Sequence, residues 1–412
     1  MAGRKQVTVI GGGSSGMVAA ISAARSGAEV VLLERMNRIG KKLLVTGNGR
    51  CNMTNANCEL SRFHGGNRAV VASVLAQFPV RDTLVFFERL GIAWKTEEDG
   101  KIYPHSDQAS AVLDVLRYEL EQLKVAILVE AEVAAVCPES GAFALQLQDS
   151  REISASRVVL ASGGRAGPQF GSNGSGYRLA RSLGHRVIEP LPGIVSLRLD
   201  ALFLPRLKGI KFVGSIQARS GGDVLRREVG EILFTDYGIS GPPVLQVSRM
   251  VMAAMKRNTT PVVALDLFPD LELEQLDRTL KDRFAQQAHK PLDMGLVGLL
   301  NKRLIPVVLA QAGIHDTSRA CAGLAAQERQ QLSALLKDWS FNVTGSQSWH
   351  DAQVAAGGIS LDEVNPATLE SLRQPGFYLC GEVLDVDGDC GGFNLQWAWS
   401  SGWVAGRHAA EC

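Results

Sequence analysis

Short apolar runs rich in β-branched residues alternate with helical stretches at the start of this chain. Residues 7–10 are predicted to form a strand buried on both faces, because three of these four positions are apolar. A helix follows and ends at Gly27, and residues 29–33 form a second apolar strand. A strand, a helix and another strand in this order predict an α/β fold.

The same pattern predicts further elements up to residue 183 and again at the end of the chain. Helices are expected over residues 68–90, broken at Pro79, and over 108–123 and 175–183. The last helix is expected over residues 394–410, where Gly402 and Gly406 permit close packing. Strands are expected at residues 92–96, 101–103, 125–129, 133–136, 143–147, 152–153, 157–161 and 376–380.

The pattern changes in the middle of the chain. Residues 190–270 and 340–352 are rich in short strands and turns, and residues 271–339 are mainly helical, with helices at 271–288, 294–304 and 327–339. We therefore predict an inserted domain at 190–352, flanked by the two parts of one domain at 1–189 and 353–412.

A glycine motif follows the first strand. Gly11, Gly13 and Gly16 have GxGxxG spacing, in which the glycines permit a tight turn, a close approach of pyrophosphate to the backbone and close packing of helix on sheet. The helix N-terminus adds unpaired N–H groups that favour an anion. Glu34 ends the second strand, at the position where such folds bind a ribose diol. Because strand, helix and acid are all in place, a dinucleotide site is predicted.

Three other segments are expected to reach the same ligand. A glycine- and lysine-rich loop at 35–57 carries Lys41, Lys42 and Arg50, which can face phosphate or the edge of a ring cofactor. A solvated basic loop is the alternative, and it is disfavoured because the loop leaves the strand end beside the predicted pyrophosphate. A glycine turn at 162–164 ends a strand, and the segment 381–395 places a helix N-terminus after Gly391 and Gly392. FAD is longer than NAD and needs such additional contacts, so this arrangement favours FAD. The last helix N-terminus would stabilise negative charge on the reduced ring.

The chain resembles the YhiN-like or BaiN-like FAD-dependent flavoproteins over essentially its whole length. The motifs that carry the resemblance are GGGSSGMVAA (11–20), GKKLLVTGNGRCNMTN (40–55), ASGG (161–164), GEILFTDYGISGPPVLQVS (230–248), AAGGIS (355–360) and CGEVLDVDGDCGGFNLQWA (380–398). The resemblance implies a glutathione-reductase-like FAD-binding Rossmann domain, interrupted by an insert made of a β-barrel and helices.

The resemblance also implies which residues surround non-covalently bound FAD, with Val133 touching the adenine through its backbone. The implied contacts are Gly11, Gly13, Gly16, Glu34, Lys42, Gly49, Arg50, Cys51, Glu382, Gly392, Phe393, Asn394 and Leu395. Neighbouring residues complete the predicted site, namely Ser14, Ser15, Arg35, Ala161, Gly163, Gly164 and Gly381.

The implied activity is hydride transfer from NAD(P)H through the flavin to a conjugated carbon–carbon double bond of a small organic substrate. Asp236 and Tyr237 are candidate proton donors in a Gly- and Pro-rich turn of the insert, which is expected to cover the substrate. Turn chemistry explains these residues equally well, and water is an alternative donor. The family often carries His at the position of Asp236, so a role for that histidine does not transfer directly. The alternative function is a non-catalytic or regulatory FAD-binding protein, or a flavoprotein acting on RNA.

Composition narrows these possibilities. The net charge of +1 gives no indication of nucleic acid or an acidic membrane as the main partner. No apolar run reaches about 18 residues, so no transmembrane helix is expected. Seven cysteines without a CxxC pair fit a reducing cytoplasm and favour neither a dithiol mechanism nor a metal site. Asp385, Asp387 and Asp389 are expected to form a hydrogen-bonded loop rather than bind calcium.

Overall fold

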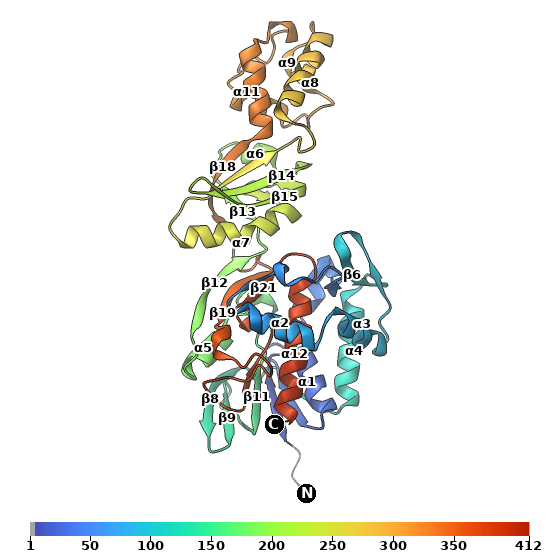
Figure 1. Ribbon diagram of the computed structural model, residues 1–412, viewed down its shortest axis with the longest axis vertical. Helices are drawn as coiled ribbons and strands as arrows, with labels where there is room; N and C mark the ends of the chain where they lie inside the picture. The colour runs from blue at the N-terminus through green and yellow to red at the C-terminus, as the bar shows by residue number, and fades with distance from the viewer. Residues whose placement is uncertain (1–4, 412) are drawn as a thin grey trace. The chain divides into compact units, whose positions relative to one another are not determined.

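The computed structural model describes residues 5–411 and divides into two compact units (Figure 1). The first unit comprises Met1–Pro192 and Ala352–Cys412, and the second unit comprises Gly193–Asp351. The second unit is thus an insertion into the chain of the first. The boundaries predicted from the sequence lie at 189/190 and 352/353.

A five-stranded parallel sheet forms the centre of the first unit, with the strand order β20-β11-β1-β2-β7. Because β1 is central, its Val7 and Val9 side chains are completely buried. The strands are β1 (Gln6–Ile10), β2 (Glu29–Leu33), β7 (Ala126–Leu128), β11 (Arg157–Leu160) and β20 (Phe377–Leu379).

Helices pack around this sheet, and the predicted break at Pro79 and the predicted last helix are both confirmed. The helices of the first unit are α1 (Ser14–Arg25), α2 (Arg68–Gln77), α3 (Val80–Arg89), α4 (Ala109–Gln122), α5 (Ser175–Ser182) and α12 (Phe393–Glu411). Smaller sheets complete the unit: β10-β9-β8 (Glu152–Ala155, Ala142–Leu147, Val133–Glu139), β3-β6-β5 (Thr54–Asn55, Lys101–Pro104, Trp94–Thr96), β12-β19 (Val187–Gly193, Val354–Ile359) and β21-β4 (Val386–Gly388, Phe63–Gly65).

Helices α1 and α12 lie side by side (Figure 1). A Cβ atom at Gly402 would lie 2.4 Å from the carbonyl oxygen of Ser15, and one at Gly406 would lie 2.1 Å from that of Ala19. Both distances are shorter than any real Cβ contact, so only glycine fits at these positions. The close packing predicted for Gly402 and Gly406 is confirmed.

A closed six-stranded barrel forms one part of the second unit, as the resemblance implied. Its strands, in order around the barrel, are β13 (Leu197–Leu199), β16 (Gly238–Ser240), β15 (Asp223–Phe234), β14 (Lys211–Ser220), β17 (Val262–Asp266) and β18 (Trp339–Ser346). Buried residues such as Ile216, Ile232 and Trp339 share one hydrophobic core with the helices of this unit. These helices are α6 (Leu204–Leu207), α7 (Pro242–Lys256), α8 (Leu273–Gln286), α9 (Leu292–Leu296), α10 (Ile305–Gln311) and α11 (Ala326–Lys337).

Three sequence-based expectations are wrong. The region 190–270 contains the long helix α7, because Pro242 and Pro243 start a helix and do not prolong a turn. The predicted helix at 294–304 is helical only at residues 294–296, which end α9, because the chain turns at Gly298 with a φ of +88° and the next helix, α10, begins at Ile305. The loop at 35–57 contains a 3-10 helix at Leu43–Gly49 and the strand β3.

One helical stretch of the described chain, Arg68–Arg89, is long and apolar enough to cross a membrane by length and composition alone. It consists of α2 and α3, which are ten residues each and are separated by Phe78 and Pro79. A spanning helix needs about 20 continuous residues, so neither helix has that length.

Candidate cofactor and active site

The GxGxxG glycines hold α1 against the ends of β1 and β11. A Cβ at Gly16 would lie 1.8 Å from the carbonyl oxygen of Gly11, and one at Gly11 would lie 2.5 Å from that of Ala161. Gly11 also has a φ of +109°, which favours glycine. These two glycines are therefore required for the packing of the protein itself.

Gly13 has a different role. A Cβ at Gly13 would meet no atom within 4 Å, so protein packing does not require glycine there. Gly13 is the N-cap of α1, with no side-chain cap and no acidic residue in the first turn. The helix N-terminus thus combines open space, uncapped N–H groups and a partial positive charge, which suits the pyrophosphate of a dinucleotide.

Glu34 lies directly after β2 and is buried beside this space. Its Oε2 accepts a hydrogen bond from Gly12 N at 2.8 Å, and its Oε1 accepts one from Met36 N at 2.7 Å. A carboxylate has about four acceptor positions, so it retains capacity for a ribose diol. Burial raises the pKa of Glu34 above its ordinary value of 4.5, although the two backbone hydrogen bonds oppose the rise.

We expect Glu34→Ala to weaken FAD binding by about 1–3 kcal/mol, because it removes hydrogen bonds to a charged acceptor. In the wild-type protein, affinity should also fall on acidification, with a midpoint above 4.5, because a protonated carboxyl group loses acceptor capacity. Fluorescence titration of the apoprotein at several pH values measures both effects. The exposed Glu29→Ala, at the other end of β2, is the matched control. An unchanged affinity in Glu34→Ala would show that the ribose binds elsewhere.

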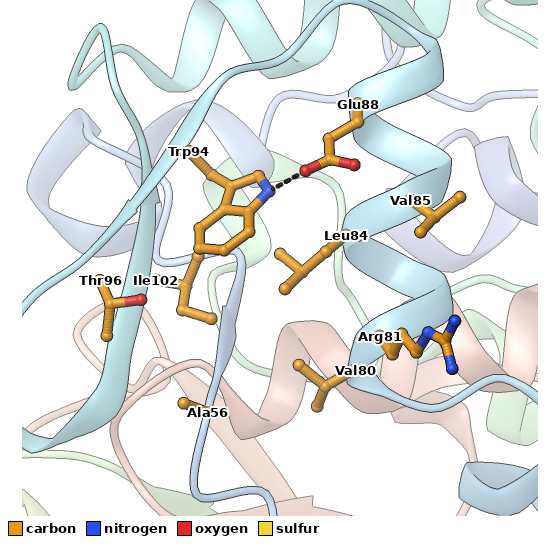
Figure 2. Close-up of a pocket in the computed structure, with 9 residues that line it drawn as sticks. All are labelled: Ala56, Val80, Arg81, Leu84, Val85, Glu88, Trp94, Thr96 and Ile102. Carbon is orange, nitrogen blue, oxygen red and sulfur yellow. Dashed lines mark hydrogen bonds between the residues drawn. The ribbon is translucent and has the colours of Figure 1, made fainter.

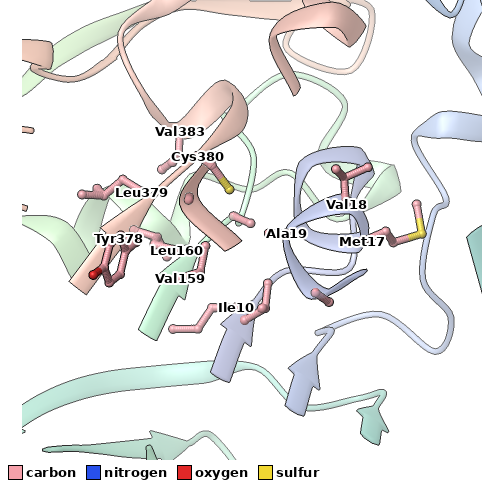
Figure 3. Close-up of a cluster of buried hydrophobic side chains, with 14 of the residues drawn as sticks. Ile10, Met17, Val18, Ala19, Val159, Leu160, Tyr378, Leu379, Cys380 and Val383 are labelled. Carbon is pink, nitrogen blue, oxygen red and sulfur yellow. The ribbon is translucent and has the colours of Figure 1, made fainter. Parts of the chain in front are cut away.

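The ends of β1, β11 and β20 meet at the N-terminal part of α1. Ala161 N donates to Ile10 O at 2.9 Å, and Cys380 N donates to Leu160 O at 3.0 Å. A Cβ at Gly381 would lie 2.3 Å from Ser15 Oγ. Figure 3 shows apolar residues of these three strands and of α1 in one buried cluster. The structure therefore brings together the predicted segments at 11–16, 161–164 and 381–382.

Lys42 joins the basic loop to the C-terminal motif. Its Nζ lies 2.7 Å from Glu382 Oε2, although the two residues are 340 positions apart. Both side chains are about one quarter exposed, so the ion pair is partly open to solvent and is not part of the core. A solvated loop without a fixed partner is therefore the wrong description of this segment.

The same loop approaches the start of α12. Gly47, Asn48, Gly49 and Cys51 all have positive φ values, which gives the loop a tightly curved backbone. A Cβ at Gly392 would lie 2.4 Å from Thr54 O, so this glycine allows β3 to contact the N-terminus of α12. Phe393, Asn394 and Leu395 form the first turn of α12. A ring placed beside this loop would therefore face a helix N-terminus.

Arg50 is placed in an ion-pair network. Its guanidinium contacts Glu97 at 2.5 Å and Asp107 at 2.6 Å, and lies 4.0 Å from the ring centroid of Tyr103. Lys95 contacts the same two carboxylates. The charge of Arg50 is therefore balanced by the protein, and a contact with FAD stays a prediction.

Cysteine chemistry is disfavoured around the site. Burial raises the pKa of the Cys51 thiol and that of the Cys380 thiol to about 12. Both groups are therefore protonated at neutral pH, whereas a nucleophilic cysteine needs the thiolate. All six cysteines of residues 5–411 are free thiols.

The predicted adenosine end lies beside Glu34. Arg35 donates from Nη1 to Gly171 O at 3.2 Å, and its Nε lies 3.4 Å from Glu132 Oε2. Val133 begins β8 next to Glu132 and is buried. Contact between these residues and an adenine stays a prediction.

Two residues near Glu382 were missed by sequence reasoning. Ala355 N donates to Glu382 Oε1 at 3.0 Å, and the buried hydroxyl of Tyr177 has no hydrogen-bond partner. Both residues lie in glycine-rich segments, AAGGIS and GSNGSGY, and this glycine content was the feature of the sequence that could have indicated them.

Asp236 and Tyr237 belong to the second unit. Lys208 Nζ lies 2.7 Å from Asp236 Oδ2 and lowers the pKa of this exposed carboxyl group. Arg198 lies 6.0 Å from the ring centroid of Tyr237. Asp236 is thus held as a carboxylate, which disfavours it as a proton donor.

The three alternating aspartates of the C-terminal motif are buried. Asp387 is in β21, and Asp389 Oδ1 lies 2.8 Å from His64 Nε2 on the paired strand β4. No group of three or more His, Cys, Asp or Glu residues suited to a metal was found among residues 5–411.

An open cavity of about 380 Å³ lies between α3 and the strands β5 and β6 (Figure 2). Its lining is mainly apolar, and Trp94 Nε1 donates to Glu88 Oε1 at 2.7 Å, which fixes the indole at the cavity. The cavity contains none of the predicted cofactor residues.

Comparison with known proteins identifies the family. The model of the HI0933-like protein Rossmann domain matches residues 5–408. The chain belongs to the HI0933-like family. This confirms the resemblance inferred from the motifs and indicates a flavin oxidoreductase with FAD as cofactor.

Two relatives of the HI0933-like family align over nearly the whole chain. A 3-dehydro-bile acid delta(4,6)-reductase of Clostridium scindens is 40% identical over 408 residues, which are 98% of this chain and 99% of that protein. A ribosomal RNA dihydrouridine synthase of Escherichia coli is 31% identical over 406 residues, 98% of each chain.

Solved structures share the fold of this HI0933-like protein. An open-conformation flavocytochrome c3 fumarate reductase has a TM-score of 0.52 at 14% identity, covering 100% of this chain and 78% of that one. A 3-ketosteroid delta1-dehydrogenase of Sterolibacterium denitrificans has a TM-score of 0.50 at 13% identity, covering 99% and 100%. The FAD-binding Rossmann-type fold is thereby confirmed.

Proposed function

We propose that the protein is an FAD-dependent reductase that uses NAD(P)H to saturate a carbon–carbon double bond conjugated to a carbonyl group in a small organic molecule. The observation that carries the proposal is the open, uncapped N-terminus of α1 at Gly13, with Glu34 beside it. Its geometry suits a dinucleotide, and the family supports FAD.

The names of the relatives support this reaction class. The Clostridium scindens relative is named for reducing delta(4,6) double bonds of a 3-dehydro bile acid, and these bonds are conjugated to the 3-oxo group. The Escherichia coli relative is named for forming dihydrouridine, which saturates a ring double bond conjugated to a carbonyl. The higher identity to the first relative and the net charge of +1 favour a small molecule over RNA.

The residues of the chain have separate tasks in this reaction. When bound, FAD supplies hydride transfer through N5 of its ring. The N-terminus of α12 at Phe393 favours negative charge nearby. A proton must then reach the carbon beside the carbonyl, and we assign its delivery to the turn with Asp236 and Tyr237. Tyr237 is favoured because Lys208 holds Asp236 ionised, and water is the competing donor.

Anaerobic mixing tests the proposal in two steps. NADH or NADPH should bleach the bound flavin, and a cyclic enone such as a 3-oxo-delta-4 steroid should restore its absorbance. Tyr237→Phe should slow the second step at least about tenfold and leave the first unchanged, whereas Asp236→Asn should slow it less, because Lys208 holds Asp236 ionised. The exposed Tyr118→Phe is the control. If neither nucleotide bleaches the flavin, NAD(P)H is not the electron donor. If both variants are reoxidised at the wild-type rate, the turn is structural.

The second candidate function is reduction of uridine in ribosomal RNA, which the two dihydrouridine synthase relatives favour. The same reduced protein, mixed with a ribosomal RNA transcript, would then form dihydrouridine detectable by mass spectrometry. Formation of dihydrouridine without reoxidation by any enone would replace the small-molecule assignment.

A further inference from the structure

Tyr177 carries a buried hydroxyl group for which the protein provides no partner. The residue lies on α5, is 4% exposed, and its Oη makes no hydrogen bond within residues 5–411. A buried polar group without a partner costs stability, so its presence calls for an explanation. The burial of the ring and the nearby charges of Glu382 and Asp385 raise the pKa of Tyr177, so the group is a neutral donor.

Gly164 creates the space that this hydroxyl faces. A Cβ at Gly164 would lie 2.8 Å from Glu382 Oε1, 2.9 Å from Ala355 Cβ and 3.1 Å from Tyr177 Oη. The hydroxyl and the carboxylate thus face the same point, and glycine is the residue that leaves it empty. Gly164 was predicted to contact the cofactor, and this contact stays a prediction. In the structure, its lack of a side chain lets the Tyr177 hydroxyl and the Glu382 carboxylate approach each other.

Glu382 has acceptor capacity left for Tyr177. Its Oε1 accepts one hydrogen bond, from Ala355 N, and its Oε2 accepts one, from Lys42 Nζ. Each carboxylate oxygen can accept two, so Oε1 has one position free. Lys42 belongs to the loop predicted to contact FAD, so a phosphate or ring edge of the bound cofactor would compete with Glu382 for its ammonium group. A carboxylate that loses Lys42 needs another donor.

We propose that Tyr177 is a positioning residue of the cofactor site, whose hydroxyl donates to Glu382 when FAD is bound and so holds the carboxylate for the hydroxyl groups of the cofactor. The hydroxyl is unpaired without cofactor and paired with it. Tyr177 therefore contributes to binding and not to the stability of the apoprotein. This inference rests on the FAD site of the proposed function.

The test compares Tyr177→Phe with the wild type in two measurements. The Kd for FAD should rise about tenfold, because a hydrogen bond to a charged group is lost. The melting temperature of the apoprotein should stay the same or rise, because an unpaired buried hydroxyl is removed. A merely structural role would lower the melting temperature. Tyr118→Phe, an exposed tyrosine on α4, is the matched control and should change neither value.

A double-mutant cycle then tests the route through Glu382. In a Glu382→Ala background, Tyr177→Phe should change the Kd less than twofold, because its acceptor is gone. The second variant, Gly164→Ala, places a methyl group between the two side chains and should also weaken FAD binding. An unchanged Kd in Tyr177→Phe, a lower apoprotein melting temperature, or an equal effect in both backgrounds overturns the inference. If the wild-type protein binds no FAD, the proposed function fails instead.

Discussion

Gly13→Val should give a folded but colourless protein. A Cβ at this position meets no protein atom within 4 Å, and Gly13 has an extended backbone with φ −79° and ψ −172°, which valine readily adopts. Its cost to the fold is therefore limited to a poorer N-cap, about 1 kcal/mol. The branched side chain would instead occupy the space assigned to the pyrophosphate. Absorbance at the flavin bands after purification measures the cofactor content, and circular dichroism measures the fold.

Gly16→Val provides the contrast three residues along the same motif. A Cβ there would lie 1.8 Å from Gly11 O, so this variant should lose its fold as well as its colour. The pair separates a glycine that makes room for the ligand from one that makes room for the protein. A yellow Gly13→Val protein with full flavin content would refute the assignment of the pyrophosphate to this helix N-terminus.

Gly406→Val should destabilise the protein by more than about 4 kcal/mol or abolish its soluble expression. A Cβ at Gly406 would lie 2.1 Å from the Ala19 carbonyl oxygen, which belongs to a helix backbone and cannot move aside. Separating α1 from α12 would disturb the helix that carries the glycine motif. Urea unfolding compared with the wild type measures the loss.

Gly323→Ala is the control for Gly406→Val, because a Cβ at Gly323 meets nothing within 4 Å. It should unfold at the wild-type urea concentration. If Gly406→Val also unfolds there, α1 and α12 do not pack through their backbones in solution.

The parts of the fold that could be predicted are those with a clear pattern within a short stretch of sequence. The β1–α1–β2 segment was found because apolar runs and glycine spacing are read within about 30 residues. The barrel was inferred only through the family resemblance, because strands such as β13 and β16 are three residues long and show no readable period. The helix α7 was missed because Pro242 and Pro243 suggest a turn as strongly as a helix start.

The candidate site also contains residues that local sequence predicts and residues that only tertiary packing brings together. Glu34 and the glycines follow from spacing, whereas the position of Tyr177 near Glu382 arises from tertiary packing around Gly164. Arg50 shows the converse problem, because its partner Asp107 is 57 residues away and no local pattern indicates that its charge is balanced. Charge alone predicts that a residue can bind an anion, but not whether a carboxylate of the protein has already bound it.

The predicted flavin site is complete only after α12 has been translated. Because a chain is translated from its N-terminus, β1 and α1 emerge before Glu382 and α12. The glycine motif is therefore made long before the backbone that covers it at Ser15 and Ala19. The barrel and its helices, encoded by one continuous segment, are complete while the first unit still lacks β20 and α12. A nascent chain of this protein thus carries the start of the predicted flavin site before α12 can pack against it.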